Sequence, residues 1–358
     1  MSVDDGTVRV SIVVPVYNSA RELEECLAAL TRWSGPKAEL IVVDDASTDE
    51  SPSVAARFAD RVVRLAHNSG PAAARNEGAR HARGDVLFFV DADVVVAPGV
   101  VGRIERTFAD DPNIVAVFGS YDATPRARGH VSRYRNLLHH FVHQTADVTA
   151  STFWAGCGAV RREVFEDLGG FDAARFRRPS IEDIEFGTRL CRAGHRVVLD
   201  KGLQGTHLKR WTLVSMIRTD VRQRAIPWSR LVLQDGNIPS TLNLTWDQRV
   251  SAALVAIIIV CVALALVRLE FLIGAGAALG GVLVLNRKLY ALFLRHGGLR
   301  FAGAGVVLHL LYFVYSALSY AYASAEHKLK GATGARASTH VEEDPLHRHA
   351  AITERKVS

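Results

Sequence analysis

The sequence predicts an α/β fold, a doubly wound and mostly parallel sheet with helices on both faces, followed by C-terminal transmembrane helices. Short apolar segments alternate with amphipathic ones in the first part of the chain, the pattern of a parallel sheet with crossover helices. Each apolar segment ends in polar residues, and the carboxyl ends of parallel strands share one sheet edge. The long apolar runs all follow residue 249, where they indicate a membrane region.

Apolar periodicity locates the elements of the sheet domain. The segment Arg21–Leu30 has leucines at positions 23, 27 and 30, which is the spacing of an amphipathic helix. The segments expected to be strands are short, apolar and bounded by turn or acidic residues. In chain order, the expected elements are strand Val10–Val16, helix Arg21–Leu30, strand Leu40–Val43, strand Arg61–Leu65, helix Ala72–Arg80 and strand Val86–Val90.

The last of these strands is the most informative, because Asp91 and Asp93 follow it directly. Two carboxylates one residue apart suit a hard divalent cation that also holds a nucleotide diphosphate. The alternative is that both acids cap the turn that precedes Pro98 and Gly99.

Composition excludes several classes of protein. The four cysteines show no CxxC spacing, which argues against a zinc ribbon and against a disulfide framework. The formal net charge is +6 without a nucleic-acid-binding motif, so an anionic membrane surface explains the charge better. The N-terminus carries two acids and no apolar stretch, so we expect no secretory signal and a cytoplasmic first domain.

Three apolar runs follow the sheet domain, at Val250–Val267, Phe271–Leu285 and Phe301–Ala323. A bilayer crossing takes about 20 residues, so the first and third runs are long enough and the second is short. The segment between the second and third runs is basic and is predicted to be cytoplasmic, which agrees with a hairpin of the first two spans. Its basic residues are Arg287, Lys288, Arg295 and Arg300.

Five motifs, in their order and spacing, resemble family 2 of the glycosyltransferases over about residues 8–230. They are SIVVPVYNS (11–19), IVVDDASTD (41–49), NSGPAAARNEG (68–78), FVDAD (89–93) and IEDIEFGTRL (181–190). The resemblance implies the GT-A fold. It also implies inverting transfer of a sugar from a nucleotide-sugar donor, with Mn²⁺ or Mg²⁺ as the cofactor.

The resemblance further implies roles on the donor side. Asp45 matches the acid that hydrogen-bonds the nucleotide base, with a turn cap as its alternative. Arg75 matches a residue that binds base or diphosphate, with a solvated helix face as its alternative. Asp93 is implied to ligate the metal, and Asp91 to contact the ribose or the metal. The implied donor-binding residues are Pro15, Tyr17, Asp45, Arg75 and Asp91.

Further matches concern the acceptor and the metal. Asp183 matches the general base that deprotonates an acceptor hydroxyl, and favourable charge at a helix N-terminus is its alternative. Glu182 and Trp154 are implied on the acceptor side, although a core role suits Trp154 equally. His207 is similar to a late histidine that supplies a third metal contact in several GT-A enzymes, and a structural or exposed histidine is the alternative.

Departures from family patterns narrow the expected acceptor. Residues 223–228 read QRAIPW where processive polysaccharide synthases carry Q-x-x-R-W, so a processive synthase is disfavoured. A matched base favours a hydroxyl acceptor over a phosphate, which is already ionised. The basic residues Arg218, Arg222 and Arg224 precede the first apolar run and are expected to meet a diphosphate or, preferably, lipid headgroups.

We therefore expect an inverting, metal-dependent glycosyltransferase that acts on a hydroxyl of a membrane-associated lipid or saccharide. A polyprenyl-phosphate sugar transferase and a non-catalytic nucleotide-sugar-binding membrane protein are the alternatives. Residues 1–245 are expected to form a cytoplasmic GT-A domain, 246–325 a plasma-membrane region with two to three transmembrane helices, and 326–358 a disordered polar tail. The sugar, the acceptor, the oligomeric state and the side of the tail stay open.

Overall fold

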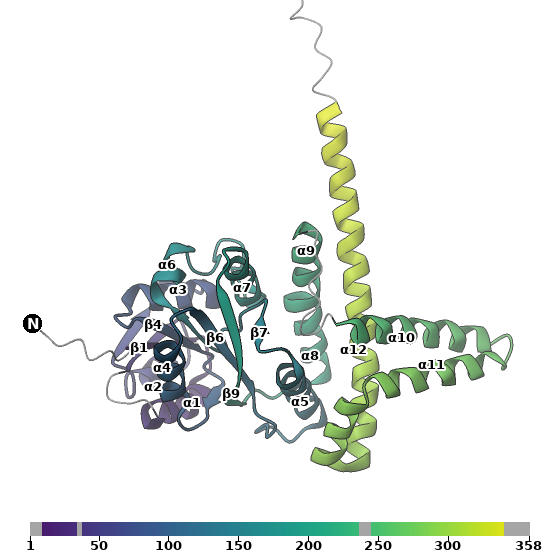
Figure 1. Ribbon diagram of the computed structural model, residues 1–358, viewed down its shortest axis with the longest axis horizontal. Coiled ribbons are helices and arrows are strands. Elements are labelled where there is room, and N and C mark those ends of the chain that lie inside the picture. The colour runs from purple at the N-terminus through teal and green to yellow at the C-terminus, as the bar shows by residue number, and fades with distance from the viewer. Residues whose placement is uncertain (1–8, 34–37, 236–244, 340–358) are drawn as a thin grey trace, which may run out of the picture.

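The computed structural model describes residues 9–33, 38–235 and 245–339 and confirms the predicted α/β class (Figure 1). The described strands form one sheet in the order β3-β2-β1-β4-β8-β6-β9-β5, with β7 paired to β9. Neighbours from β3 to β4 are parallel, as are β6 and β9, whereas β5, β7 and β8 run antiparallel to their partners. The sheet is therefore mixed and mostly parallel.

The elements have the following bounds. The strands are β1 (Val10–Val16), β2 (Glu39–Asp44), β3 (Arg61–Arg64), β4 (Val86–Val90), β5 (Val94–Val96), β6 (Ile114–Tyr121), β7 (Thr149–Ala150), β8 (Cys157–Arg161) and β9 (Arg196–His207). The helices of the α/β body are α1 (Ala20–Trp33), α2 (Ser51–Ala55), α3 (Pro71–His81), α4 (Val100–Asp110), α5 (His130–Thr145), α6 (Arg162–Asp167) and α7 (Glu182–Arg192). The later helices are α8 (Leu213–Thr219), the π-helix η1 (Asp220–Ala225), α9 (Ile226–Asp235), α10 (Trp246–Ala265), α11 (Phe271–Leu285) and α12 (Arg287–Thr339).

Helices cover both faces of the sheet, which explains why its strands are continuous apolar runs. Every residue of β1 is buried. On one face, Ile12 and Val14 pack in a cluster with Leu27 of α1. On the other face, Val13 packs in a cluster that includes Phe186 of α7.

Four phenylalanines anchor α7 to the sheet. The rings of Phe89, Phe165, Phe171 and Phe186 lie with centroids 5.2 or 5.3 Å apart in tilted and edge-on contacts. Burial of one such side chain contributes about 1.5–3 kcal/mol to the free energy of unfolding. Because Phe89 belongs to β4, this cluster fixes the start of α7 relative to the strand that carries Asp91.

Helices α10 and α11 form the expected hairpin across residues 268–270, and it projects away from the α/β body on the far side of α12 (Figure 1). Large apolar side chains near its tip are exposed, among them Leu266, Val267 and Ile273. By length and composition, α10 and the segment Arg287–Lys330 of α12 could each cross a membrane, whereas α11 has 15 residues and is shorter.

Helix α12 is broken at Gly298, whose φ of 68° is not helical, and then continues to Thr339. It packs against α5, η1 and α9 of the preceding domain. Residues 326–339 continue this helix, and residues 340–358, the rest of the tail expected to be disordered, lie outside the described residues. Pairs of Glu326 with Lys330 and with Arg230 stabilise part of this extension, a contribution that a polar composition alone does not reveal.

Candidate active site

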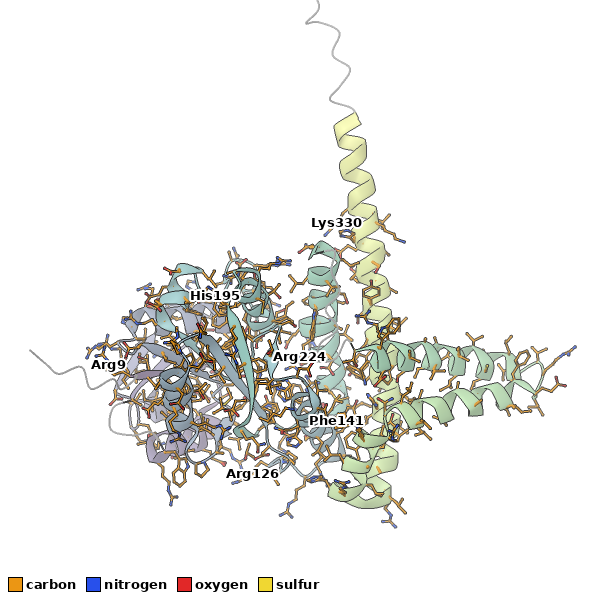
Figure 2. The ribbon with its side chains drawn as sticks, in the orientation of Figure 1. Arg9, Arg126, Phe141, His195, Arg224 and Lys330 are labelled. Atoms are coloured by element: carbon orange, nitrogen blue, oxygen red, sulfur yellow. The ribbon has the colours of Figure 1, made fainter. Side chains whose placement is uncertain are left out.

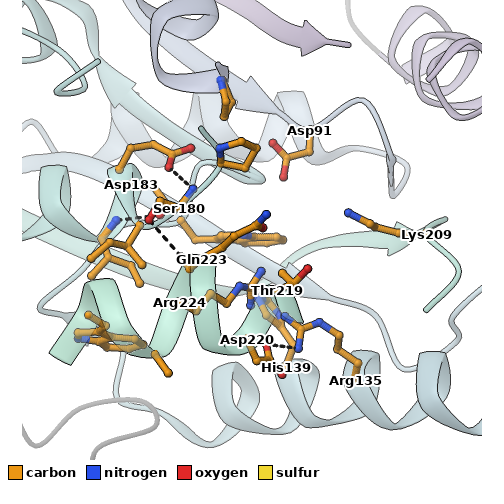
Figure 3. A pocket seen from close by; sticks show the side chains of 18 of the residues that line it. Asp91, Arg135, His139, Ser180, Asp183, Lys209, Thr219, Asp220, Gln223 and Arg224 are labelled. Carbon is orange, nitrogen blue, oxygen red and sulfur yellow. Dashed lines mark hydrogen bonds and ion pairs between the residues drawn. The ribbon is translucent and has the colours of Figure 1, made fainter. Parts of the chain in front are cut away.

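One cavity of about 1110 Å³ collects every site residue predicted from the sequence (Figure 3). These residues are Pro15, Tyr17, Asp45, Arg75, Asp91, Asp93, Trp154, Glu182, Asp183 and His207. The cavity lies at the carboxyl ends of β1, β2 and β4, as expected for an open α/β sheet, and η1, α10 and α12 also line it.

Asp45 binds the backbone of the loop before α3. Its Oδ1 accepts a hydrogen bond from the Ser69 amide at 2.7 Å, and its Oδ2 accepts one from the Gly70 amide at 2.9 Å. Burial raises the pKa of Asp45, although these two amides oppose the shift. Each oxygen retains a second lone pair, so these contacts are compatible with accepting a hydrogen bond from a ligand in the cavity.

Arg75 is buried and joins the two acidic motifs, which excludes the solvated helix face. Its Nη2 donates to Asp91 Oδ1 at 2.7 Å and its Nη1 to Glu182 Oε1 at 2.9 Å. Burial alone would lower the pKa of Arg75, but the charges of these carboxylates outweigh it and raise the pKa. Two of the guanidinium nitrogens of Arg75, which was predicted to bind the nucleotide-sugar, thus hold Asp91 and Glu182 in place.

Asp93 and His207 lie together because β5, a strand that the sequence did not predict, pairs with the end of β9. The register places Val94 opposite His207, and the Leu208 amide donates to the Asp93 carbonyl at 2.9 Å. As a result, His207 Nε2 lies 3.5 Å from Asp93 Oδ2. Burial alone would raise the pKa of Asp93, but His207 and then Lys209 lower it overall.

This pair fits a divalent metal by its chemistry, because a carboxylate oxygen and an imidazole nitrogen suit Mn²⁺. Within residues 9–33, 38–235 and 245–339, no group of three or more His, Cys, Asp or Glu side chains is arranged to hold a metal. The chain therefore offers two ligands here, and the others would come from a bound diphosphate and water.

Asp183 occupies the first turn of α7, apart from the Asp93 pair. Its Oδ2 accepts a hydrogen bond from the Ala155 amide at 3.1 Å, and its Oδ1 accepts one from the Ile184 amide at 2.8 Å. Burial, followed by the charge of Glu182, raises the pKa of Asp183 to about 6. A carboxylate with a pKa close to the working pH is suited to general-base catalysis.

One wall of the cavity is a cluster of packed rings, which we call the aromatic wall, and the sequence pointed only to Trp154 and His207 in it. Its other members are Tyr121, His139 and His143. The ring of Tyr121 stacks on His207 with centroids 4.4 Å apart, and Trp154 packs edge-on against Tyr121 at 4.9 Å. Burial lowers the pKa values of His139 and His143, that of His143 to about 4, so both side chains are neutral at pH 7. Their spacing of four residues on α5 was the only signal in the sequence. Trp154 both packs in this wall and lines the cavity.

Comparisons with known proteins relate the chain to glycosyltransferases. Residues 11–169 match the model of the family described as Glycosyl transferase family 2. An uncharacterized protein of Mycobacterium tuberculosis is 28% identical over 273 residues, covering 69% of this chain and 83% of that protein. The uncharacterized glycosyltransferase YibD of Escherichia coli is 36% identical over 116 residues, which cover 31% of this chain and only 34% of YibD.

Among solved structures, a mannosyltransferase of Pyrobaculum calidifontis in complex with GDP-Man and Mn²⁺ superimposes with a TM-score of 0.56. The two chains are 22% identical, and the match covers 88% of this chain and 87% of the other. This likeness supports the fold. Together with the family match, it identifies residues 11–169 as a glycosyltransferase family 2 domain with a GT-A type fold.

Proposed function

We propose that the protein transfers a sugar from a nucleotide-sugar donor to a hydroxyl group of a membrane-associated lipid or saccharide, with inversion and with Mn²⁺ or Mg²⁺. One observation carries this proposal: two acids in one cavity have pKa values shifted in opposite directions, Asp93 downward and Asp183 upward. Such a difference assigns distinct tasks to two carboxyl groups at neutral pH.

The donor would lie along the strand ends. The base is proposed to contact Asp45 and Tyr17, which line the cavity beside Pro15. Asp91, held by Arg75, is proposed to face the ribose, and Asp93 with His207 to hold the metal. A bound divalent ion would neutralise the charge that develops on the departing diphosphate. The mannosyltransferase of Pyrobaculum calidifontis, solved with GDP-Man and Mn²⁺, supports this donor class.

The acceptor would enter from the side of Asp183. An inverting transfer is one in-line displacement, so the base must remove a proton from the hydroxyl that attacks opposite the leaving group. The Ala155 and Ile184 amides fix both oxygens of Asp183, and its raised pKa provides basicity that an ordinary aspartate lacks. Glu182 is tied to Arg75 and is proposed to orient Asp183 rather than contact the acceptor.

The C-terminal helices support a proposed membrane location. The exposed apolar surface of the α10–α11 hairpin is proposed to insert into the plasma membrane from its cytoplasmic face. Basic residues at the base of the hairpin, including Arg287 and Lys288, would meet anionic headgroups. The cavity reaches α10 and α12, so an acceptor embedded in the membrane would have access to Asp183.

The test separates the two acids. Asp93→Ala should weaken metal-dependent binding of a nucleoside diphosphate and abolish transfer, because the metal loses a ligand. Asp183→Asn should bind the nucleotide almost as wild type but transfer the sugar about 100- to 10,000-fold more slowly. Calorimetric titration with GDP or UDP and Mn²⁺, beside a radiolabelled transfer assay, measures both. Transfer by Asp183→Asn at a near wild-type rate would exclude Asp183 as the base.

A further inference from the structure

Arg224 of η1 is a cation that is exposed to the cavity. Its side chain lines the cavity and makes no hydrogen bond or ion pair with the described residues (Figure 3). Figure 2 shows Arg224 between the α/β body and α12. The other two arginines of this stretch, Arg218 and Arg222, do not line the cavity. The structure thus distinguishes one of three arginines that the sequence treated alike.

The guanidinium of Arg135, next to Arg224, has a nitrogen that donates no hydrogen bond. Arg135 of α5 pairs through Nη1 with Asp220 at 2.5 Å, while its Nη2 is buried without a hydrogen-bond partner. Both oxygens of Asp220 have a partner, because the other one accepts a hydrogen bond from Tyr315 of α12 at 2.6 Å. The side chain of Arg224 is exposed to the cavity. Partial desolvation by the surrounding protein and then the charge of Arg135 lower its pKa, so an anion bound here would stabilise both cations.

These arginines are separate from the cation next to Asp93 and His207. Lys209 is the residue whose positive charge acts on Asp93, together with His207. Arg224 instead is acted on by the charges of Asp220 and Asp183, after that of Arg135. In Figure 3, Arg224, Asp220 and Arg135 form a group of their own, away from Asp91. Among the cations that line the cavity, Arg224 and Arg135 thus lie apart from Lys209, which acts on Asp93.

The C-terminal helices contribute a mixed part of the cavity wall, in which aromatic and small apolar side chains stand beside the polar Gln248, Arg249 and Ser316. Ala252 of α10 and Phe313 and Tyr320 of α12 line the same cavity as Arg224. A ligand with a hydrocarbon chain and an anionic group would fit here, because the chain could contact the apolar side chains and the anion could contact the two guanidinium groups. Guanidinium groups are well suited to phosphate oxygens, which they bind through forked hydrogen bonds.

We propose that Arg224 and Arg135 bind the phosphate of an acceptor that carries a hydrocarbon chain, with this chain between α10 and α12. The proposal rests on the proposed transferase activity and specifies its acceptor as a phosphate-linked lipid. The phosphate takes no part in the chemistry. The acceptor hydroxyl gives its proton to Asp183 and forms the new bond to the sugar, while the bond from the sugar to the nucleoside diphosphate breaks.

The test is a binding experiment on the full-length protein in detergent, using dodecyl phosphate, dodecanol and inorganic phosphate as probes. Wild type should bind dodecyl phosphate more tightly than either of the other two. Arg224→Ala should weaken dodecyl phosphate binding about 10- to 100-fold, the loss expected for a charge-assisted hydrogen bond, and Arg224→Lys should weaken it less. Arg222→Ala, in the same helix but outside the cavity, is the matched control and should bind as wild type.

Titration of the same proteins with GDP or UDP and Mn²⁺ separates this proposal from the proposed function. Arg224→Ala should retain wild-type nucleotide affinity. If it loses nucleotide affinity and keeps dodecyl phosphate affinity, the arginine serves the donor and the proposal is wrong. Equal binding of dodecyl phosphate and dodecanol, or of dodecyl phosphate and inorganic phosphate, would also overturn it. Wild type that binds dodecyl phosphate but no nucleotide would instead contradict the transferase function.

Discussion

At the scale of single residues, Arg75 shows how a motif residue can act through its neighbours. It was expected at the base or diphosphate of the donor, but its guanidinium pairs with Asp91 and Glu182. The pairing of Arg75 with these two carboxylates also affects the pKa of Asp183, which lies next to them. Arg75 lowers the pKa of Asp183, yet burial and Glu182 together outweigh it. The strength of the proposed base is therefore set by residues that do not contact the acceptor.

This balance predicts the pH dependence of transfer. Asp183 must be ionised to accept a proton, and its pKa is about 6, so kcat/KM should fall about tenfold per pH unit well below pH 6. Glu182→Gln removes a negative charge and frees Arg75, and both changes lower the pKa of Asp183. The acidic limb of the pH profile should therefore move to lower pH in this variant. If the acidic limb of the kcat/KM profile does not move in Glu182→Gln, a group other than Asp183 controls the loss of activity at low pH.

At the scale of elements, helix α7 holds Asp183 by coming very close to the segment before β8. Gly187 faces the backbone there, and an added Cβ would lie 2.2 Å from the Phe153 nitrogen and 2.4 Å from the Thr152 carbonyl carbon. Only glycine permits this approach without movement of the backbone. The same approach lets the Ala155 amide reach the carboxylate of Asp183.

We predict that Gly187→Ala separates α7 from residues 152–155. Overpacking should lower the free energy of unfolding by about 1–3 kcal/mol, even though alanine favours helices. It should lower kcat more than nucleotide affinity, because the displaced contact belongs to Asp183. Gly102→Ala in α4 is the control, since its Cβ would meet nothing closer than 3.8 Å. Equal stability and kcat for the two variants, by denaturant titration and transfer assay, would contradict this account.

At the scale of the whole molecule, contacts along α12 decide how it lies relative to the catalytic domain. Near one end, Arg133 of α5 donates to the His296 carbonyl. In the middle, Tyr315 bonds to Asp220, and near the other end Glu326 pairs with Arg230 of α9 at 2.8 Å. A helix that contacts the catalytic domain at both ends and in the middle stays on the same side of the membrane as that domain. We therefore infer that the α10–α11 hairpin inserts into the membrane and that α12 lies along the membrane–water interface.

Reporter fusions test this topology. Fusions at the N-terminus, near His296 and after Lys330 should all report the cytoplasm, whereas a fusion at Arg268 in the hairpin tip should not. Three separate spans would place the fusion after Lys330 on the opposite side from that at His296. That result would contradict the interfacial position of α12 while leaving the catalytic proposal intact.

The sequence alone determined the four strands β1 to β4, the helices α1 and α3, and the resemblance of the domain to family 2, but it missed the short elements α2 and β5. These depend on local patterns, such as the apolar run of β4 that ends in Asp91 and Asp93, and on motifs whose residues are neighbours in the chain. Because parallel strands end at a common edge, the grouping of motif residues in one cavity was also predictable.

Only the tertiary structure decided which side chains bind one another. Arg75 and Glu182 are 107 residues apart, Asp93 meets His207 through the short strand β5, and Arg135 meets Asp220 through the packing of α5 on η1. No local pattern encodes these contacts, because each depends on register and packing between distant elements. The same reason explains why Arg224 could not be distinguished from Arg218 and Arg222 in the sequence: its position in the cavity is set by where η1 lies against α5 and α12.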